Sequence, residues 1–254
     1  MLQRDDHLTT IDHEGRLLAV AATVAGPDAP VPTCPEWVVR DLVLHQGEVH
    51  RWATAVIAGG LAKPSLIPAD HLGPLPDDAG LMTWFEDGHR ALLDALRCAP
   101  DDLAAFTFLN DAPPAVLFWA RRQAHETEMH RVDAESAAGG HTPVATASAA
   151  DGIDEFLTGF VTRPRTPLRA STDRSLAVAL TDHAAAWRLV IGEGPAVAER
   201  IDRARAETAD CFVTGAAEDV YLALWNRREL ASLTISGDAA VLDLFRANVR
   251  VSWA

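Results

Sequence analysis

The sequence RRQAHETEMHRVD, at residues 121–133, gives the clearest indication of the fold of the N-terminal half. It lies in a helical segment with clear end signals, because two prolines precede it at 113–114 and two glycines follow it at 139–140. Glu126 and His130 are four residues apart, so both side chains project from one face of this helix. The pair alone is weak evidence for a metal site, because charged residues on a helix usually form a solvated face.

His45 is the third candidate ligand, and it belongs to a different helix. It follows an apolar run at 42–44, where an imidazole needs a polar partner, although a hydrogen-bonded core histidine also explains such a position. Two imidazoles and one carboxylate leave the fourth position of a tetrahedral zinc ion open to water, thiol or substrate. From the residues alone, His45, Glu126 and His130 are candidates for a metal site of the catalytic type.

The composition is that of a globular protein that works without nucleic acid or membrane. A length of 254 residues is enough for two modest domains or one large one. Of these residues, 48% are hydrophobic and 23% are charged, as in globular proteins. The net charge of -14 opposes binding to phosphate backbones and anionic membranes, and no apolar run is long enough to span a bilayer. The start of the chain lacks a signal-peptide core, and Cys34, Cys98 and Cys211 form no Cys-x-x-Cys motif. We therefore expect a protein of the reducing cytoplasm.

Further helical segments precede these prolines. Their apolar residues recur at helical intervals, and they span approximately 5–24, 33–58 and 79–98. The second of them opens with a capping-box arrangement of Thr33 and Glu36. Helices of this length favour an antiparallel four-helix bundle whose core can hold metal ligands. His45 and Trp52 share a helix face, so Trp52 is a candidate wall of the substrate site, with ordinary core packing as the alternative.

The pattern changes in the C-terminal half. A short helix near 149–160 is followed by Arg-Pro-Arg-Thr-Pro at 163–167, which we interpret as a domain edge. Strand-like runs bounded by turn residues follow at 176–180, 187–191, 211–214 and 233–236, and helical segments interleave at 216–225 and 239–248. The sequence therefore predicts a helical domain at 1–162 and a small α+β domain with a mostly antiparallel sheet at 163–254.

Several parts of the sequence resemble the mycothiol-dependent maleylpyruvate isomerase family, a branch of the DinB-like metal-binding helix bundles. These parts are residues 31–45 with His50-Arg51-Trp52, residues 121–133, and residues 213–219, 224–228 and 236–239. The resemblance covers nearly the whole chain. It implies a DinB-like four-helix bundle followed by a sterol-carrier-like α+β domain, and it implies zinc bound by His45, Glu126 and His130.

The resemblance also implies an activity. Zinc would hold the low-molecular-weight thiol mycothiol, the reductant of actinobacteria, as a thiolate near neutral pH. The thiolate would add to the double bond of maleylpyruvate and leave after bond rotation, or it would attack another small electrophile, such as an epoxide, in an S-transfer. Nickel or iron could occupy the same donor set. We expect the chain to act as a monomer or a weak homo-oligomer.

Arginines are the candidates for binding carboxylates of the substrate. The family pattern nominates Arg227 as a catalytic and substrate-binding residue and Arg228 as a second substrate-binding residue, with a solvated helix end as the alternative for both. Arg122 lies one turn before Glu126 and is a weaker substrate-binding candidate.

Some interpretations stay open at this point. His50 and His125 lie off the ligand face of their helices, so we interpret them as supporting or surface residues. The same fold could instead serve a non-catalytic small-molecule-binding or regulatory protein, because fold alone does not determine function. An open metal site could also activate water in a hydrolase that needs no thiol.

Overall fold

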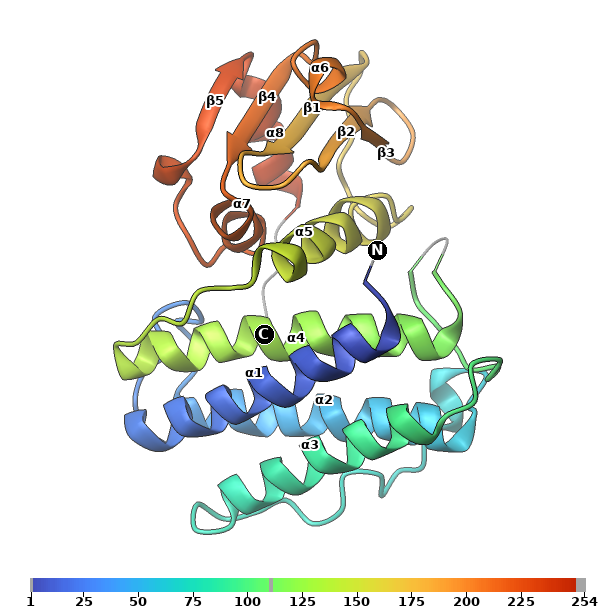
Figure 1. Cartoon of the computed structure of the whole chain (residues 1–254), viewed down its shortest axis with the longest axis vertical. Helices are drawn as coiled ribbons and strands as arrows, with labels where there is room; N and C mark the ends of the chain where they lie inside the picture. The colour runs from blue at the N-terminus through green and yellow to red at the C-terminus, as the bar shows by residue number, and fades with distance from the viewer. Residues whose placement is uncertain (1, 110–111, 250–254) are drawn as a thin grey trace. The chain divides into compact units, whose positions relative to one another are not determined.

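A computed structural model describes residues 2–109 and 112–249 of the chain. They divide into two compact units, the first formed by residues up to 108 and by 112–142, and the second by residues from 143 onward together with Leu109. The first unit is helical, and the second contains the sheet (Figure 1). This confirms the predicted α+β, two-domain fold class. The predicted division of the chain at residues 162 and 163 stays a prediction. Helix α5 (Thr146–Asp154) precedes that point and packs against a helix of the second unit.

The first unit is a four-helix bundle. Its helices are α1 (Arg4–Ala25), α2 (Val39–Gly59), α3 (Leu81–Cys98) and α4 (Ala115–Ala138), and a short 3-10 turn, η1 (Pro64–Leu66), lies in the α2–α3 connection. Helix α1 packs against α4 and α3, and α2 packs against α3 and α4. Fully buried side chains such as Ile11, Leu42, Phe85 and Trp119 fill the centre. Helix α4 ends at Gly139, whose φ of 70° is the left-handed conformation that glycine adopts readily.

Two glycines allow close packing against α3. Gly15 of α1 lies against the His89 ring, and Gly47 of α2 lies against the Trp84 ring, so that a Cβ atom at either glycine would overlap the ring. The His89 Nε2 atom also donates a hydrogen bond of 2.9 Å to the carbonyl oxygen of Ile11. Large side chains on α3 therefore fit into notches that the glycines leave on its two neighbours.

Helix α2 starts later than the sequence predicted. Residues 30–38 form turns and one isolated β-bridge, between Pro30 and Val38, and the helix begins at Val39. Its first turn is capped by Asp41, whose carboxylate accepts a 3.0 Å hydrogen bond from the Val38 amide. The predicted capping box at Thr33 is therefore wrong. Its hydroxyl donates to Asp133 of α4 instead, a partner that is distant in the sequence.

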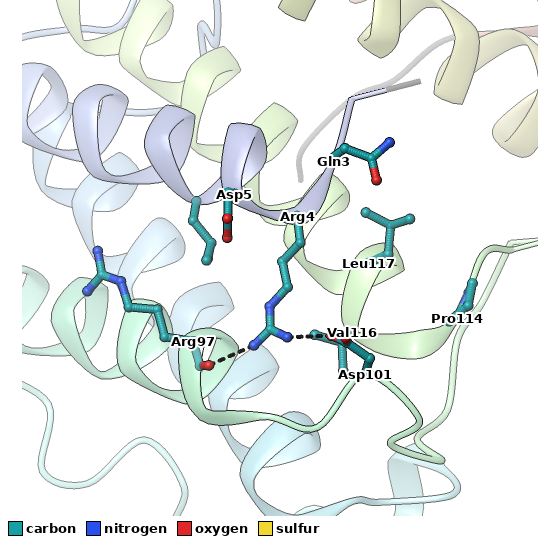
Figure 2. Close-up of a pocket in the computed structure, with 9 residues that line it drawn as sticks. Gln3, Arg4, Asp5, Arg97, Asp101, Pro114, Val116 and Leu117 are labelled. Atoms are coloured by element: carbon teal, nitrogen blue, oxygen red, sulfur yellow. Dashed lines mark hydrogen bonds and ion pairs between the residues drawn. The ribbon is translucent and has the colours of Figure 1, made fainter.

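Arg4 connects the start of α1 to the end of α3. Its guanidinium donates to the carbonyl oxygen of Arg97 and pairs with Asp101 at 2.7 Å (Figure 2). It also donates to the carbonyl oxygen of Leu96. A cation at this position suits the negative end of the α3 dipole. The pocket around Arg4 is lined by the ends of these helices and by Val116 of α4, and it contains none of the candidate metal ligands.

The second unit is a five-stranded mixed sheet with helices. Its strands are β1 (Arg174–Leu180), β2 (Ala186–Ile191), β3 (Val197–Ile201), β4 (Cys211–Gly215) and β5 (Thr234–Gly237), in the spatial order β3-β2-β1-β4-β5. Among these strands of the described residues, only β1 and β4 pair in parallel, which confirms the mostly antiparallel sheet. The helical segments are α5, the π-helical η2 (Glu155–Phe160), α6 (Arg203–Ala206), α7 (Ala217–Leu224), η3 (Leu230–Ser232) and α8 (Ala239–Asn248). The sequence analysis missed β3 and α6.

Two contacts organise this unit. Apolar side chains of β1 and β4, such as Leu176 and Val213, face Val220 of α7 and Phe245 of α8 in a small apolar pocket. In the same unit, Asp154 of α5 accepts from both Arg200 of β3, at 2.5 Å, and the Trp187 indole, at 2.8 Å. In the described part of the chain, no helix is long and apolar enough to cross a membrane.

Candidate metal centre

The structure brings the three predicted ligands together inside the helical unit. His45 comes from α2, and Glu126 and His130 come from α4, which packs against α2. The Nε2 atom of His45 lies 3.7 Å from Glu126 Oε1, and the Nε2 atom of His130 lies 3.5 Å from the same oxygen. All three donor atoms lie within 4.8 Å of one another. His45 and Glu126, 81 positions apart in the sequence, thus lie in one cluster with His130.

The spacing of the donor atoms fits a small divalent cation. Ligand atoms about 2.0 to 2.2 Å from a tetrahedral zinc ion lie about 3.3 to 3.6 Å apart, from the tetrahedral angle alone. The observed separations of 3.5 and 3.7 Å are close to these values. Two imidazoles and one carboxylate are also the donor types of catalytic zinc sites. The residues present therefore fit such an ion.

Glu126 is held as a carboxylate. Its burial raises the pKa, but the neighbouring imidazoles of His130 and His45 and the charge of Arg122 outweigh this effect and keep the pKa well below its usual range. Arg122 donates a 3.1 Å hydrogen bond to Oε2 of Glu126, and both side chains are buried. Arg122 therefore positions the Glu126 carboxylate and leaves Oε1 directed at the two imidazoles. Its predicted substrate-binding role stays a prediction.

His130 is oriented by a second carboxylate, that of Asp133. The Nδ1 atom of His130 lies 2.9 Å from Asp133 Oδ2, and both side chains are fully buried. Burial lowers the pKa of His130, but its interactions with Asp133 and Glu126 dominate and raise it. A proton therefore competes with a cation for Nε2. The sequence analysis missed Asp133, although its position one turn after His130 was an available signal.

Trp37 is the second site residue that the sequence analysis missed. Its ring centroid lies 4.9 Å from that of His45 and 5.9 Å from that of His130, and the indole is half-buried. It belongs to the segment 30–38, which the sequence predicted to be partly helical. The indole therefore forms an aromatic wall against both imidazoles, the kind of wall that had been predicted for Trp52.

Trp52 packs in an aromatic cluster of the bundle. Its ring centroid is 4.8 Å from that of Trp119 and 6.0 and 6.2 Å from those of Phe106 and Phe108. These are the contacts expected of the core-packing alternative. A substrate-binding role for Trp52 stays a prediction.

His50 and His125 are not surface residues. Both side chains have an exposed fraction of 0%. The Nε2 atom of His50 lies 3.0 Å from the Thr127 hydroxyl, and burial followed by the nearby His89 lowers its pKa well below the usual range. The His125 ring lies 6.0 Å from that of His7. The surface interpretation was wrong because both residues face the interior of the packed bundle.

Arg227 and Arg228 lie in the second unit, three and four residues after the last residue of α7. The Arg227 guanidinium donates a 2.8 Å hydrogen bond to the carbonyl oxygen of Trp225. Arg228 pairs with Asp219 and Glu218 at the start of α7. Their proposed catalytic and substrate-binding roles stay predictions.

Comparisons with known proteins agree with this architecture. Residues 8–135 match the family model described as the mycothiol maleylpyruvate isomerase N-terminal domain, and residues 147–244 match the model of the C-terminal domain of the same isomerase. The crystal structure of a mycothiol-dependent maleylpyruvate isomerase superposes with a TM-score of 0.63 at 12% identity, over 92% of this chain and 93% of that one. A histidine-to-alanine mutant of a mycothiol-dependent maleylpyruvate isomerase superposes with a TM-score of 0.61 at 12% identity over the same shares. A comparison with curated proteins finds no match.

Proposed function

Because this chain belongs to the mycothiol-dependent maleylpyruvate isomerase family, we propose that it is a zinc-dependent and mycothiol-dependent enzyme. It would use a thiolate to attack a small electrophile, either in a cis-trans isomerisation or in an S-transfer. The observation that carries the proposal is the cluster of His45, Glu126 and His130, whose donor atoms have the spacing of ligands around one ion. Arg122 donates a hydrogen bond to Glu126, and Asp133 accepts one from His130. Hydrogen bonds of this kind commonly orient the ligands of metal sites.

Different residues of the chain would bind the metal, shield it from water and bind carboxylates. His45, Glu126 and His130 would hold the metal, and Trp37 would shield the two imidazoles from water on one side. A zinc ion there would lower the pKa of a bound thiol and keep it as thiolate near neutral pH. Arg227 and Arg228 would pair with carboxylates of the substrate or the thiol, because guanidinium groups bind carboxylates in a bidentate geometry.

In the isomerisation of maleylpyruvate, the thiol would be regenerated unchanged at the end of the reaction. The thiolate sulfur would form a bond to one carbon of the activated double bond while the π electrons move onto the conjugated carbonyl oxygen as an enolate, so the carbon–carbon bond becomes single and rotates. The enolate electrons would then restore the double bond in the trans arrangement as the sulfur leaves with the electrons of the carbon–sulfur bond, which regenerates the thiolate. In an S-transfer the carbon–sulfur bond would persist in the product.

The test combines metal analysis with turnover. Wild-type protein is loaded with zinc, and maleylpyruvate and a model epoxide are supplied with and without mycothiol. We expect about one zinc per chain and thiol-dependent conversion of one electrophile. The His45→Ala variant should lose most of its zinc, and its turnover should fall at least about 100-fold, because two protein donors rarely hold a zinc ion.

His71→Ala is the matched control, because His71 lies in the α2–α3 connection outside the cluster. It should keep both zinc and activity. Full zinc content and full turnover in His45→Ala would contradict the proposal. Turnover without thiol would favour the hydrolase, and ligand binding without conversion of either electrophile would favour the non-catalytic protein.

A further inference from the structure

Asp133 connects the ligand His130 to the segment that precedes α2. Its Oδ2 atom accepts from His130 Nδ1 at 2.9 Å, and its Oδ1 atom accepts a 2.6 Å hydrogen bond from the Thr33 hydroxyl. The Cys34 Sγ atom also lies 3.6 Å from Oδ2. The Asp133 side chain is fully buried. Each oxygen of this carboxylate therefore has a donor, and the donors come from two separate parts of the chain.

The segment around Thr33 is itself held in place. The Val31 amide donates to the Trp37 carbonyl oxygen at 3.0 Å, and the Cys34 amide donates to the Val31 carbonyl oxygen at 3.0 Å. The Thr33 Oγ1 atom also lies 3.3 Å from the hydroxyl oxygen of Ser136. Backbone hydrogen bonds thus close residues 31–37 into a loop and fix the position from which Thr33 reaches Asp133.

This arrangement determines which nitrogen of His130 is available. A carboxylate accepts but does not donate hydrogen bonds, so an imidazole facing it carries its proton on Nδ1. In the neutral imidazole, Nε2 then presents its lone pair to the cluster, where Glu126 Oε1 lies 3.5 Å away. With Thr33 bound to Oδ1, the plane of the carboxylate is fixed, and rotation of Asp133 away from His130 would break the Thr33 contact.

We propose that Thr33 and Asp133 form a positioning pair that fixes the orientation and the tautomer of His130, and thereby the affinity of the centre for its metal ion. This inference rests on the proposed metal site. The sequence analysis interpreted the Thr33 hydroxyl as a helix cap. In this inference the hydroxyl instead supports the metal site through Asp133.

The experiment measures the zinc dissociation constant by competition with a chromophoric chelator in wild-type, T33V, T33S and D133N proteins. Asp133→Asn should weaken zinc binding about 10-fold to 100-fold, the usual effect of removing a carboxylate behind a metal-bound histidine. Thr33→Val keeps the shape of the side chain and removes only the hydroxyl, so it should weaken binding severalfold, and Thr33→Ser should restore it. The visible absorption of cobalt-loaded protein should shift in both weakened variants, because the ligand geometry changes.

Thr54→Val is the matched control. Its hydroxyl donates to the His50 carbonyl oxygen within α2, so the variant should bind zinc as the wild type does. Circular dichroism of each metal-free variant checks that it folds, and Thr33→Val decides the question if Asp133→Asn does not fold. Wild-type zinc affinity and an unchanged cobalt spectrum in Thr33→Val would overturn the inference and leave the proposed function standing. A wild-type protein that binds no divalent metal would overturn both.

Discussion

Charged side chains inside the bundle are stabilised by specific partners. The Arg131 side chain has an exposed fraction of 0%, and its guanidinium donates to Glu14 at 2.5 Å, to Glu135 at 2.8 Å and to the Thr142 carbonyl oxygen at 2.6 Å. Burial raises the pKa of Glu14 in spite of the charge of Arg131. Removal of Arg131 would therefore leave buried carboxylates without their counterion, which is costly.

Two buried histidines should make the protein less stable in acid. Burial lowers the pKa of His50, helped by the charge of nearby His89, and burial also lowers that of His89. Above the unfolded-state pKa of histidine, about 6.5, these two side chains are neutral in both the folded and the unfolded protein, so they make no pH-dependent contribution to stability. Below it, the unfolded chain binds protons that the folded protein does not, so the free energy of unfolding falls as the pH falls.

Urea unfolding at pH 7.5 and at pH 5.5 checks this prediction. The wild type should unfold at a lower urea concentration at pH 5.5, and His50→Gln should reduce the difference between the two midpoints. His71→Gln, outside the bundle core, should leave the difference as it is in the wild type. An equal pH dependence in His50→Gln and the wild type would show that His50 does not contribute.

At the scale of elements, the packing of α3 depends on the notch at Gly15. An added methyl group there would overlap the His89 ring and disturb its hydrogen bond to Ile11. Gly15→Ala should therefore lower the free energy of unfolding by about 1 to 3 kcal/mol, the usual cost of overpacking, less up to ~1 kcal/mol for the better helix propensity of alanine. Denaturant unfolding measures this difference.

Gly194→Ala is the comparison for this prediction. A Cβ atom at Gly194 meets nothing within 4 Å, and the residue is exposed. Its substitution should change the free energy of unfolding by no more than about 0.5 kcal/mol. Equal stability of the two variants would show that His89 moves aside without cost.

At the scale of the whole molecule, the two units carry different parts of the proposed chemistry. The proposed metal ligands lie in the first unit, and Arg227 lies in the second. Arg227→Ala should therefore keep the zinc content of the wild type and lower kcat/KM about 10-fold to 100-fold, since a hydrogen bond to a charged group contributes about 1.5 to 3 kcal/mol. Metal analysis and steady-state kinetics of the same preparation separate the two effects.

Arg205→Ala is the control for Arg227→Ala. Arg205 is an exposed arginine of the second unit, paired with Glu199 at 3.3 Å, and its loss should change neither zinc content nor turnover. Loss of zinc from Arg227→Ala, or an unchanged kcat/KM, would contradict the proposed division of roles.

Local patterns in the sequence were enough to predict most elements. Periodicity and end signals predicted the four long helices of the bundle, and strand-like runs predicted β1, β2, β4 and β5. Strand β3 was missed because Val197–Ile201 is mostly exposed and lacks the apolar alternation that reveals a half-buried strand. Its place in the sheet comes from pairing with β2, which no local pattern records.

The candidate site shows the same limit. Glu126 and His130 are one helical turn apart, and the resemblance to the family linked His45 to them, so the ligand set to be tested could be predicted before the fold was known. The surroundings of these residues follow from tertiary packing: Trp37 lies against both imidazoles, and Thr33 contacts Asp133, 100 residues away in the sequence. Helix geometry relates side chains within a few turns, whereas contacts between distant segments form only when the helices pack.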